Sequence, residues 1–347
     1  MKKRLAYLDV LRVIAILAVL LMHSASSAES LISKNTTDFP FHFTLFFNAL
    51  TRFAVPLFLM ISGSLMINTN RPYSVIIKKI LHFLTVFLIW SFLYTLVLYF
   101  KDFGSRFSIS LFLDIAYDTL KGRFHFWYIF LICGLYLILP FIDILIQNIN
   151  NSQKKLFVTL SVVLCFVGPL FSLFDISKAS IAQHLSEANV GFVGGYALYF
   201  MLGYWLKDVT VKSYKWPVIC LLTSAIFTIG VSSYLSIGQG ETVKIFMENI
   251  TPNILLLTVS LFLLIKKRFE TGIRSSFFSK SFSLLSRLSF GVYLVHMLVL
   301  DRFSVLVPLF TDNIVVALLF IFFGTTLVSY LITYILYHIP FTRKIVT

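Results

Sequence analysis

An arginine and a histidine stand at the two ends of a long apolar run near the start of the chain. Arg12 and His23 enclose ten uninterrupted apolar residues in the stretch RVIAILAVLLMH. In an α-helix the two side chains lie on one face, about 16 Å apart along the axis and only about 20° apart around it. Guanidinium groups bind phosphates and other anions, and a histidine can act as a general base near neutral pH. The spacing therefore predicts an anion grip and a proton acceptor on one side of one helix.

Other charged residues lie inside apolar segments, where each costs roughly 2.5 to 3.5 kcal/mol near the centre of a bilayer. Arg52 falls near the middle of the second apolar segment, Asp9 lies one turn before Arg12, and Asp143 lies near the end of the fourth segment. We expect a functional role for both arginines. The alternative is a structural ion pair with Asp9 or Asp143.

The segments that carry these residues predict an all-α membrane protein. Apolar residues make up 58% of the 347 residues and charged residues only 13%, which is outside the range of soluble domains. Runs of roughly 20 apolar residues can span a bilayer only as helices. We count ten: 5–27, 42–67, 75–99, 125–147, 155–174, 190–206, 216–236, 251–265, 282–301 and 314–338. The prediction is a single polytopic helical bundle over residues 1–347, without a fused soluble domain.

The net charge of +14 follows the membrane and does not indicate a nucleic-acid partner. With a cytoplasmic N-terminus, the inner segments hold 19 basic residues and two acids, whereas the outer segments hold eight basic residues and eleven acids. This bias predicts a multi-pass protein of the plasma membrane with both termini in the cytoplasm. The run Lys266, Lys267, Arg268 could hold phosphate groups or anchor the chain to the anionic inner leaflet of the membrane.

Three local features have a second interpretation. The N-terminal run imitates a signal peptide, but Asp9, Arg12 and His23 inside it argue against removal. Residues 100–124 are either an amphipathic helix at the outer interface or a structured loop. The three cysteines have no CxxC or Cys/His spacing, so we expect no metal site.

Several stretches together resemble the membrane-bound acyltransferase-3 family. The first, YLDVLRVIAILAVLLMH (7–23), has the family's arginine and histidine separated by ten residues. The others are RFAVPLFLMISGSLM (52–66), HFWYIFLICGLYLILP (125–140), GYALYFMLGYWL (195–206) and LSRLSFGVYLVHMLVL (285–300). They run from the first expected helix to the ninth in the family's order.

The resemblance implies transfer of an acyl group, usually acetyl, from cytosolic acyl-CoA to a hydroxyl of a cell-surface or lipid-linked glycan. In this chain His23 matches the catalytic histidine and Arg12 the motif arginine, and Arg52 aligns with a basic residue before the VPLF stretch. Both arginines are therefore candidates for binding acyl-CoA. Acyl-CoA is then a co-substrate, and no cofactor is bound permanently. Some members carry a further soluble domain after the last helix, whereas nine residues follow residue 338 in this sequence. Transfer is therefore expected to finish within the bundle or to pass to a separate partner protein.

A base, an oxyanion and a sugar each need further groups. Asp301, five residues after His296, is a candidate for orienting His23. Hydroxyl or indole groups could donate to the oxyanion, and the remaining histidines could bind glycan hydroxyls or complete the base. The candidates are Ser62, Trp127, Tyr128, Tyr293, His125 and His296. Packing is the alternative role for each of them.

The competing function is a transporter or flippase of an anionic glycan or lipid-linked substrate, because buried arginines could also escort an anion. The sequence shows no inverted repeat and no paired broken helices. Acyl transfer is therefore the favoured prediction.

Overall fold

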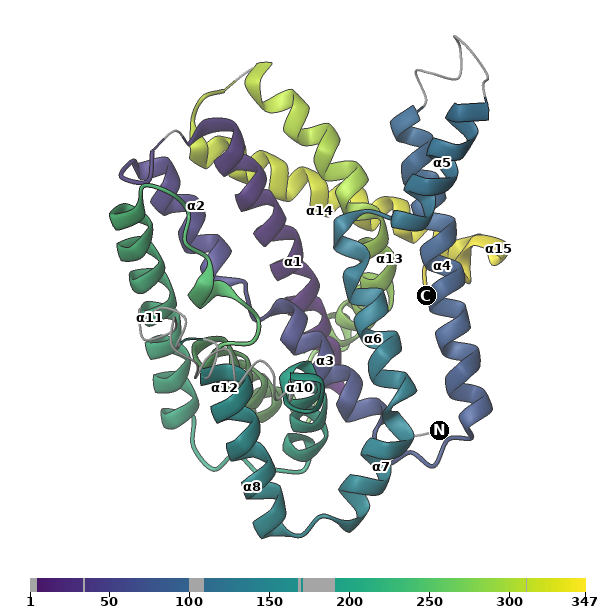
Figure 1. The fold of residues 1–347 in the computed structure, drawn as a ribbon, viewed down its shortest axis with the longest axis vertical. Helices are drawn as coiled ribbons and strands as arrows, with labels where there is room; N and C mark the ends of the chain where they lie inside the picture. Colours follow the sequence, from purple (N-terminus) through teal and green to yellow (C-terminus); the bar gives the residue numbers. More distant parts are fainter. Residues whose placement is uncertain (1–4, 34, 100–108, 168–169, 171–190, 310) are drawn as a thin grey trace. The chain divides into compact units, whose positions relative to one another are not determined.

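The structure is a computed structural model, which describes all residues except 1–4, 34, 100–108, 168–169, 171–190 and 310 (Figure 1). The described residues form helices and no strands, which confirms the all-α prediction. They separate into two compact units, Met1–Ile67 with Ile149–Thr333 and Asn68–Asn148 with Tyr334–Thr347. We call them the α1 unit and the α4 unit.

The α1 unit holds most of the helices. They are α1 (Ala6–Ile32), α2 (Phe39–Leu50), α3 (Ala54–Met66), α8 (Asn151–Ser161), the π-helix η3 (Val162–Val167), α10 (Gly191–Lys207), α11 (Lys215–Gln239), η6 (Ile245–Met247), α12 (Pro252–Phe269), α13 (Ser276–Leu306), η7 (Val307–Leu309) and most of α14 (Ile314–His338). Within it α1 packs against α2, α3, α12 and α13 (Figure 1). Arg12 and His23 both lie on this central helix.

The α4 unit is smaller. It holds α4 (Tyr73–Tyr99), α5 (Ile109–Lys121), η2 (Phe124–Phe126), α6 (Trp127–Leu137), α7 (Leu139–Asn148) and α15 (Pro340–Arg343). The α5 helix supports the helical interpretation of residues 109–121, and the start of that segment lies outside the described residues. Asp143 accepts a hydrogen bond from the backbone N–H of Asn68 at 2.7 Å, so it serves this unit.

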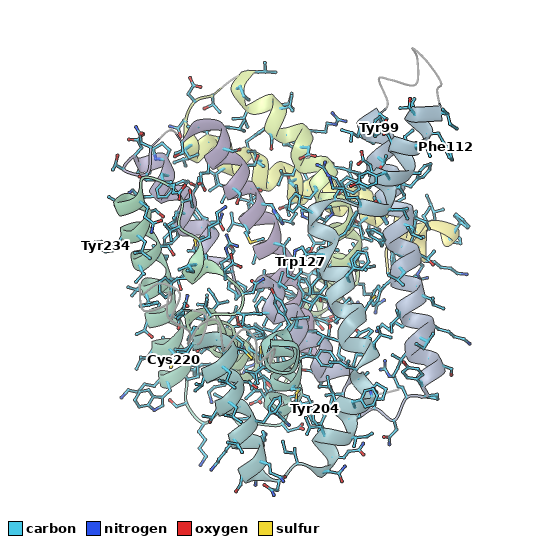
Figure 2. All side chains as sticks on the ribbon, in the orientation of Figure 1. Tyr99, Phe112, Trp127, Tyr204, Cys220 and Tyr234 are labelled. Carbon is cyan, nitrogen blue, oxygen red and sulfur yellow. The ribbon has the colours of Figure 1, made fainter. Side chains whose placement is uncertain are left out.

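Seven described helical segments are long and apolar enough to cross a membrane, and the α5–α6 and α7 pair, bent by 51°, makes eight if it is one span. The chain is therefore a multi-pass membrane protein, although the predicted count of ten is not reached among these residues. The expected span 155–174 becomes α8 and a π-helical turn, and most of its remainder lies outside the described residues. The expected span 190–206 is the 17-residue α10, which bends at Gly195. One side of α11 is exposed, and its Tyr234 is 76% exposed (Figure 2).

The second expected span is not one helix. It is broken between α2 and α3 at residues 51–53. Pro56 causes the break, because a proline cannot donate to the carbonyl four residues earlier and its ring collides with that carbonyl, here that of Arg52. The end of α2 is satisfied locally, since the Thr51 hydroxyl donates to the Phe47 carbonyl at 2.7 Å. Arg52 is therefore held at an interruption inside the span.

Two glycines allow α3 and α10 to cross closely. An added Cβ at Gly63 would fall against the backbone carbonyl of Phe200, and one at Gly203 would fall against that of Met60. The Ser64 hydroxyl also donates to the Gly203 carbonyl at 2.7 Å across the crossing. Small residues that let backbones touch are the usual basis of helix association in lipid.

The basic run on α12 holds the end of α10. Lys266 donates to the carbonyls of Leu206, at 3.0 Å, and Val209, and Lys267 donates to the carbonyl of Val211 at 2.5 Å. Cations near a helix C-terminus satisfy its last carbonyls and favour its dipole. The structure therefore gives these two lysines a role in packing that neither sequence-based interpretation included.

Candidate active site

The Arg12 end of the α1 face is fixed by α13. The Arg12 guanidinium donates to the Ser286 hydroxyl at 3.0 Å, and that hydroxyl donates to the Asp9 carboxylate at 2.8 Å. Asp9 and Ser286 are buried, whereas Arg12 is half-buried. A serine from another helix thus bridges Arg12 and Asp9, whose association the sequence predicts, and the Arg12 residue stays partly exposed.

The His23 end of the same face meets a second histidine. The ring centroids of His23 and His296 lie 5.4 Å apart, although the two residues are far apart in the sequence. His23 is half-buried and His296 is 0% exposed. Of the two imidazoles, His23 is therefore the one that a substrate can reach.

His296 is oriented by its own helix. Its Nδ1 lies 2.6 Å from the Tyr293 carbonyl, which can only accept, so Nδ1 carries the hydrogen. In the neutral ring this leaves Nε2 as the acceptor. Tyr293 is also buried, with its ring centroid 6.0 Å from that of His296. Of the predicted binding residues, His296 thus lies beside His23, and Tyr293 lies beside His296.

Arg52 is the cation of this region. One terminal nitrogen of its guanidinium donates to the Asn48 side-chain carbonyl at 2.6 Å, and the Asn48 amide donates to the Ser26 hydroxyl at 2.7 Å. Ser26 lies one helical turn beyond His23 on α1, and Arg52 and His296 are the charged or titratable groups that act on His23. The structure therefore places Arg52 near the His23 end of α1 and not near the Arg12 end.

Two glutamates complete the charge pattern, and sequence reasoning missed both. Glu29 and Glu248 are the acids that act on Arg52, and Glu29 accepts a hydrogen bond from the Thr242 hydroxyl at 3.2 Å. The first span was expected to end at residue 27, but α1 continues to Ile32. Ala25, Ala28 and Glu29 itself are strong helix formers, a signal for this extra turn.

The other predicted residues lie elsewhere. Asp301 is half-buried on α13, about 140° around that helix from His296, and its orienting role stays a prediction. Ser62 is half-buried on α3, whose neighbouring Gly63 and Ser64 face α10.

Three predicted binding residues belong to the α4 unit. His125 is buried, with its ring 5.4 Å from Tyr94 and 4.2 Å from Phe126 between ring centroids. Trp127 is 40% exposed and Tyr128 half-buried, at the start of α6. These three residues therefore belong to a different unit from His23.

The amino-acid sequence matches the model of a known protein family. A family model described as an acyltransferase domain matches residues 5–334, from the start of α1 to near the end of α14. No curated protein matches the chain, and no solved structure does. The match covers nearly the whole sequence, including both ends of the α1 face and the α2–α3 break. The chain belongs to the acyltransferase-3 family.

Proposed function

We propose that this membrane acyltransferase moves an acyl group, most simply acetyl, from cytosolic acyl-CoA to a hydroxyl of an extracytoplasmic or lipid-linked glycan. The observation that carries the proposal is the α1 face, with an accessible arginine braced by Ser286 at one end and the His23–His296 pair at the other. An anion with a long flexible arm, such as CoA, fits a cation and a base separated by about 16 Å on one helix.

At the donor end, Arg12 binds a phosphate or another anionic group of CoA near the cytoplasmic surface. Its bond to Ser286 fixes the position of the guanidinium at this end of the face. The pantetheine arm then runs along α1 and brings the thioester to His23.

At the acceptor end, His23 takes the proton of the glycan hydroxyl as the oxygen attacks the thioester carbonyl carbon. The carbon–sulfur bond then breaks, and the CoA thiolate receives the proton from His23. The products are an ester and free CoA. His296 orients His23 from its buried side, with Asp301 as a further candidate, because a catalytic base needs a positioned partner.

The glycan is held by polar aromatic and hydroxyl groups. Tyr293 lies beside His296 and fits this role. We keep four further residues as proposed binding residues: His125, Trp127, Tyr128 and Ser62. Their hydroxyl, indole and imidazole groups suit sugar hydroxyls.

We further propose a plasma-membrane location with both termini in the cytoplasm, as the charge bias predicts. The acceptor belongs to a cell-envelope polysaccharide or its lipid-linked precursor. A separate envelope protein is needed only where the acyl group is passed onward. Mass spectrometry of envelope glycans from cells with and without the protein tests this directly. A mass difference of one acyl group is expected, and identical glycans would overturn the proposed acceptor class.

Ser286→Ala is expected to raise the KM for acyl-CoA about tenfold with little change in kcat. The serine braces Arg12 but lies at the opposite end of the face from His23, and a hydrogen bond to a charged group contributes about 1.5 to 3 kcal/mol. Steady-state kinetics with varied acyl-CoA measures the effect. The matched control is Ser289→Ala, which removes a buried hydroxyl bonded only to the Ser286 carbonyl of its own helix in the described contacts. An unchanged KM in Ser286→Ala would remove Arg12 from the donor site.

Transport remains the second candidate because the α2–α3 break is the kind of discontinuous helix that transporters use at substrate sites. Vesicles that contain the purified protein separate the two functions. Movement of an anionic glycan lipid without any acyl-CoA favours transport, whereas strict dependence on acyl-CoA favours acyl transfer.

A further inference from the structure

The α2–α3 break holds Arg52 where two positive features meet. Its side chain is in the group that includes His23 and His296, and its backbone immediately precedes the first turn of α3. The start of α3, a helix of 13 residues, has no side-chain cap at Phe53. The partial positive charge of a helix N-terminus adds to the charge of the arginine, although the Ala54 N–H already donates to the Thr51 carbonyl at 3.0 Å and Pro56 has no N–H. An anion at this place would therefore bind chiefly through the Arg52 side chain.

One terminal nitrogen of the Arg52 guanidinium is held by Asn48, whereas its Nε is buried without a described partner. Asn48 accepts from one terminal nitrogen at 2.6 Å and is itself fixed to Ser26 of α1 at 2.7 Å, and Asn48 is only 2% exposed. The Nε of Arg52 is also buried, yet it has no hydrogen-bond partner within the described part of the chain. A buried N–H donor without a partner is destabilising, and a ligand oxygen at that position would restore the missing hydrogen bond.

Two acids lie near enough to act on the charge of Arg52. Glu29 and Glu248 both act on Arg52, and Thr242 holds Glu29 from a third segment. These acids stabilise the cation in the membrane and do not occupy Nε in the described contacts. The group is therefore preorganised, which is what electrostatic catalysis requires.

We infer that Arg52 stabilises the negative charge that develops on the thioester carbonyl oxygen during acyl transfer. The inference rests on the proposed function and places Arg52 at the acyl end of acyl-CoA. When the acceptor oxygen bonds to the carbonyl carbon and His23 takes its proton, the carbonyl electron pair moves to the oxygen. Arg52 Nε–H donates to that oxyanion. The pair returns as the carbon–sulfur bond breaks, the thiolate takes the proton from His23, and ester and CoA leave.

The experiment compares Arg52→Gln with Arg302→Gln in purified protein reconstituted in vesicles, with acetyl-CoA as the donor. Arg302 is an exposed arginine of α13, so its replacement removes the same charge from the surface. Three quantities are measured: the Kd for acetyl-CoA, the kcat for transfer to a glycan acceptor, and the slow hydrolysis of acetyl-CoA by water without an acceptor. Removing one oxyanion donor lowers kcat about 10²- to 10³-fold in other enzymes.

The expected result is a loss of that size in Arg52→Gln for both transfer and hydrolysis, with an unchanged Kd, and no loss in Arg302→Gln. Added guanidinium ion should restore part of the activity of Arg52→Ala. A raised Kd with unchanged kcat would assign Arg52 to CoA binding, and loss of transfer with unchanged hydrolysis would assign it to an anionic group of the acceptor. Either result overturns the inference.

Asn48→Ala supplies the same test if Arg52→Gln does not fold. Without Asn48 the guanidinium loses its fixed position but keeps its charge, so kcat should fall about tenfold while the Kd for acetyl-CoA stays unchanged. An unchanged kcat would overturn the inference. Wild-type protein that neither binds acetyl-CoA nor releases CoA would instead refute the proposed function itself.

Discussion

Replacing His23 with alanine is expected to lower acyl transfer about 10²- to 10⁴-fold while acyl-CoA binding is retained. His23 is the accessible member of the buried histidine pair, and the proposed mechanism gives it the only proton transfer on the acceptor side. Arg12 and its brace Ser286 lie about three helical turns away and are not disturbed. The measurements are transfer of a labelled acetyl group and equilibrium binding of acetyl-CoA.

The matched control is His338→Ala, because His338 is an exposed histidine at the end of α14. It should transfer acetyl groups at the wild-type rate. Continued transfer in His23→Ala would refute the histidine-base mechanism. Parallel loss of binding and transfer would show that His23 supports the donor site instead.

The second large effect is on folding. Valine at Gly63 or Gly203 is expected to abolish recovery of folded protein, because each new Cβ would meet a backbone carbonyl of the partner helix. Backbone atoms cannot rotate aside as a side-chain tip can, so α3 and α10 would have to separate. The separation would also break the bond from Ser64 to Gly203 and move the helix that begins at the Arg52 break.

Size-exclusion chromatography of detergent-extracted protein measures this effect. Gly230→Val on α11 is the matched control, since a Cβ there meets nothing within 4 Å. It should elute as the wild type does. Folded, monodisperse Gly63→Val or Gly203→Val protein would show that the close crossing of α3 and α10 is not required.

The sequence predicts helices well where apolar length alone decides them. The spans around Arg12, Leu93 and Phe262 lie within observed helices because each run is long and bounded by polar residues. The count of ten is harder, because the 17 residues of α10 and the π-helical turn after α8 depend on how neighbours satisfy a short or distorted segment. Pro56 marks an irregularity in the second span, but a proline can either kink a helix or break it. The structure has a break there, between α2 and α3.

The site is predictable only along one helix. Periodicity places Arg12 and His23 on one face of α1, and the structure keeps both on that helix. The partners come from other helices at no fixed sequence distance, so Ser286 and Asn48 carry no sequence signal of their own. The role of a buried polar residue depends on its tertiary contacts, whereas a charged residue inside an apolar run can be recognised from the sequence alone.

In the proposed mechanism, α1 carries both the arginine that binds acyl-CoA on one side of the membrane and the histidine that acts as the base toward the other side. The most direct measurement uses sealed vesicles of one protein orientation, with acetyl-CoA only on the side of the N-terminus and a glycan acceptor only on the other side. The account predicts acetylated acceptor on its own side and an equal amount of free CoA thiol on the side of the donor. Acetylation only when donor and acceptor share one side would contradict it.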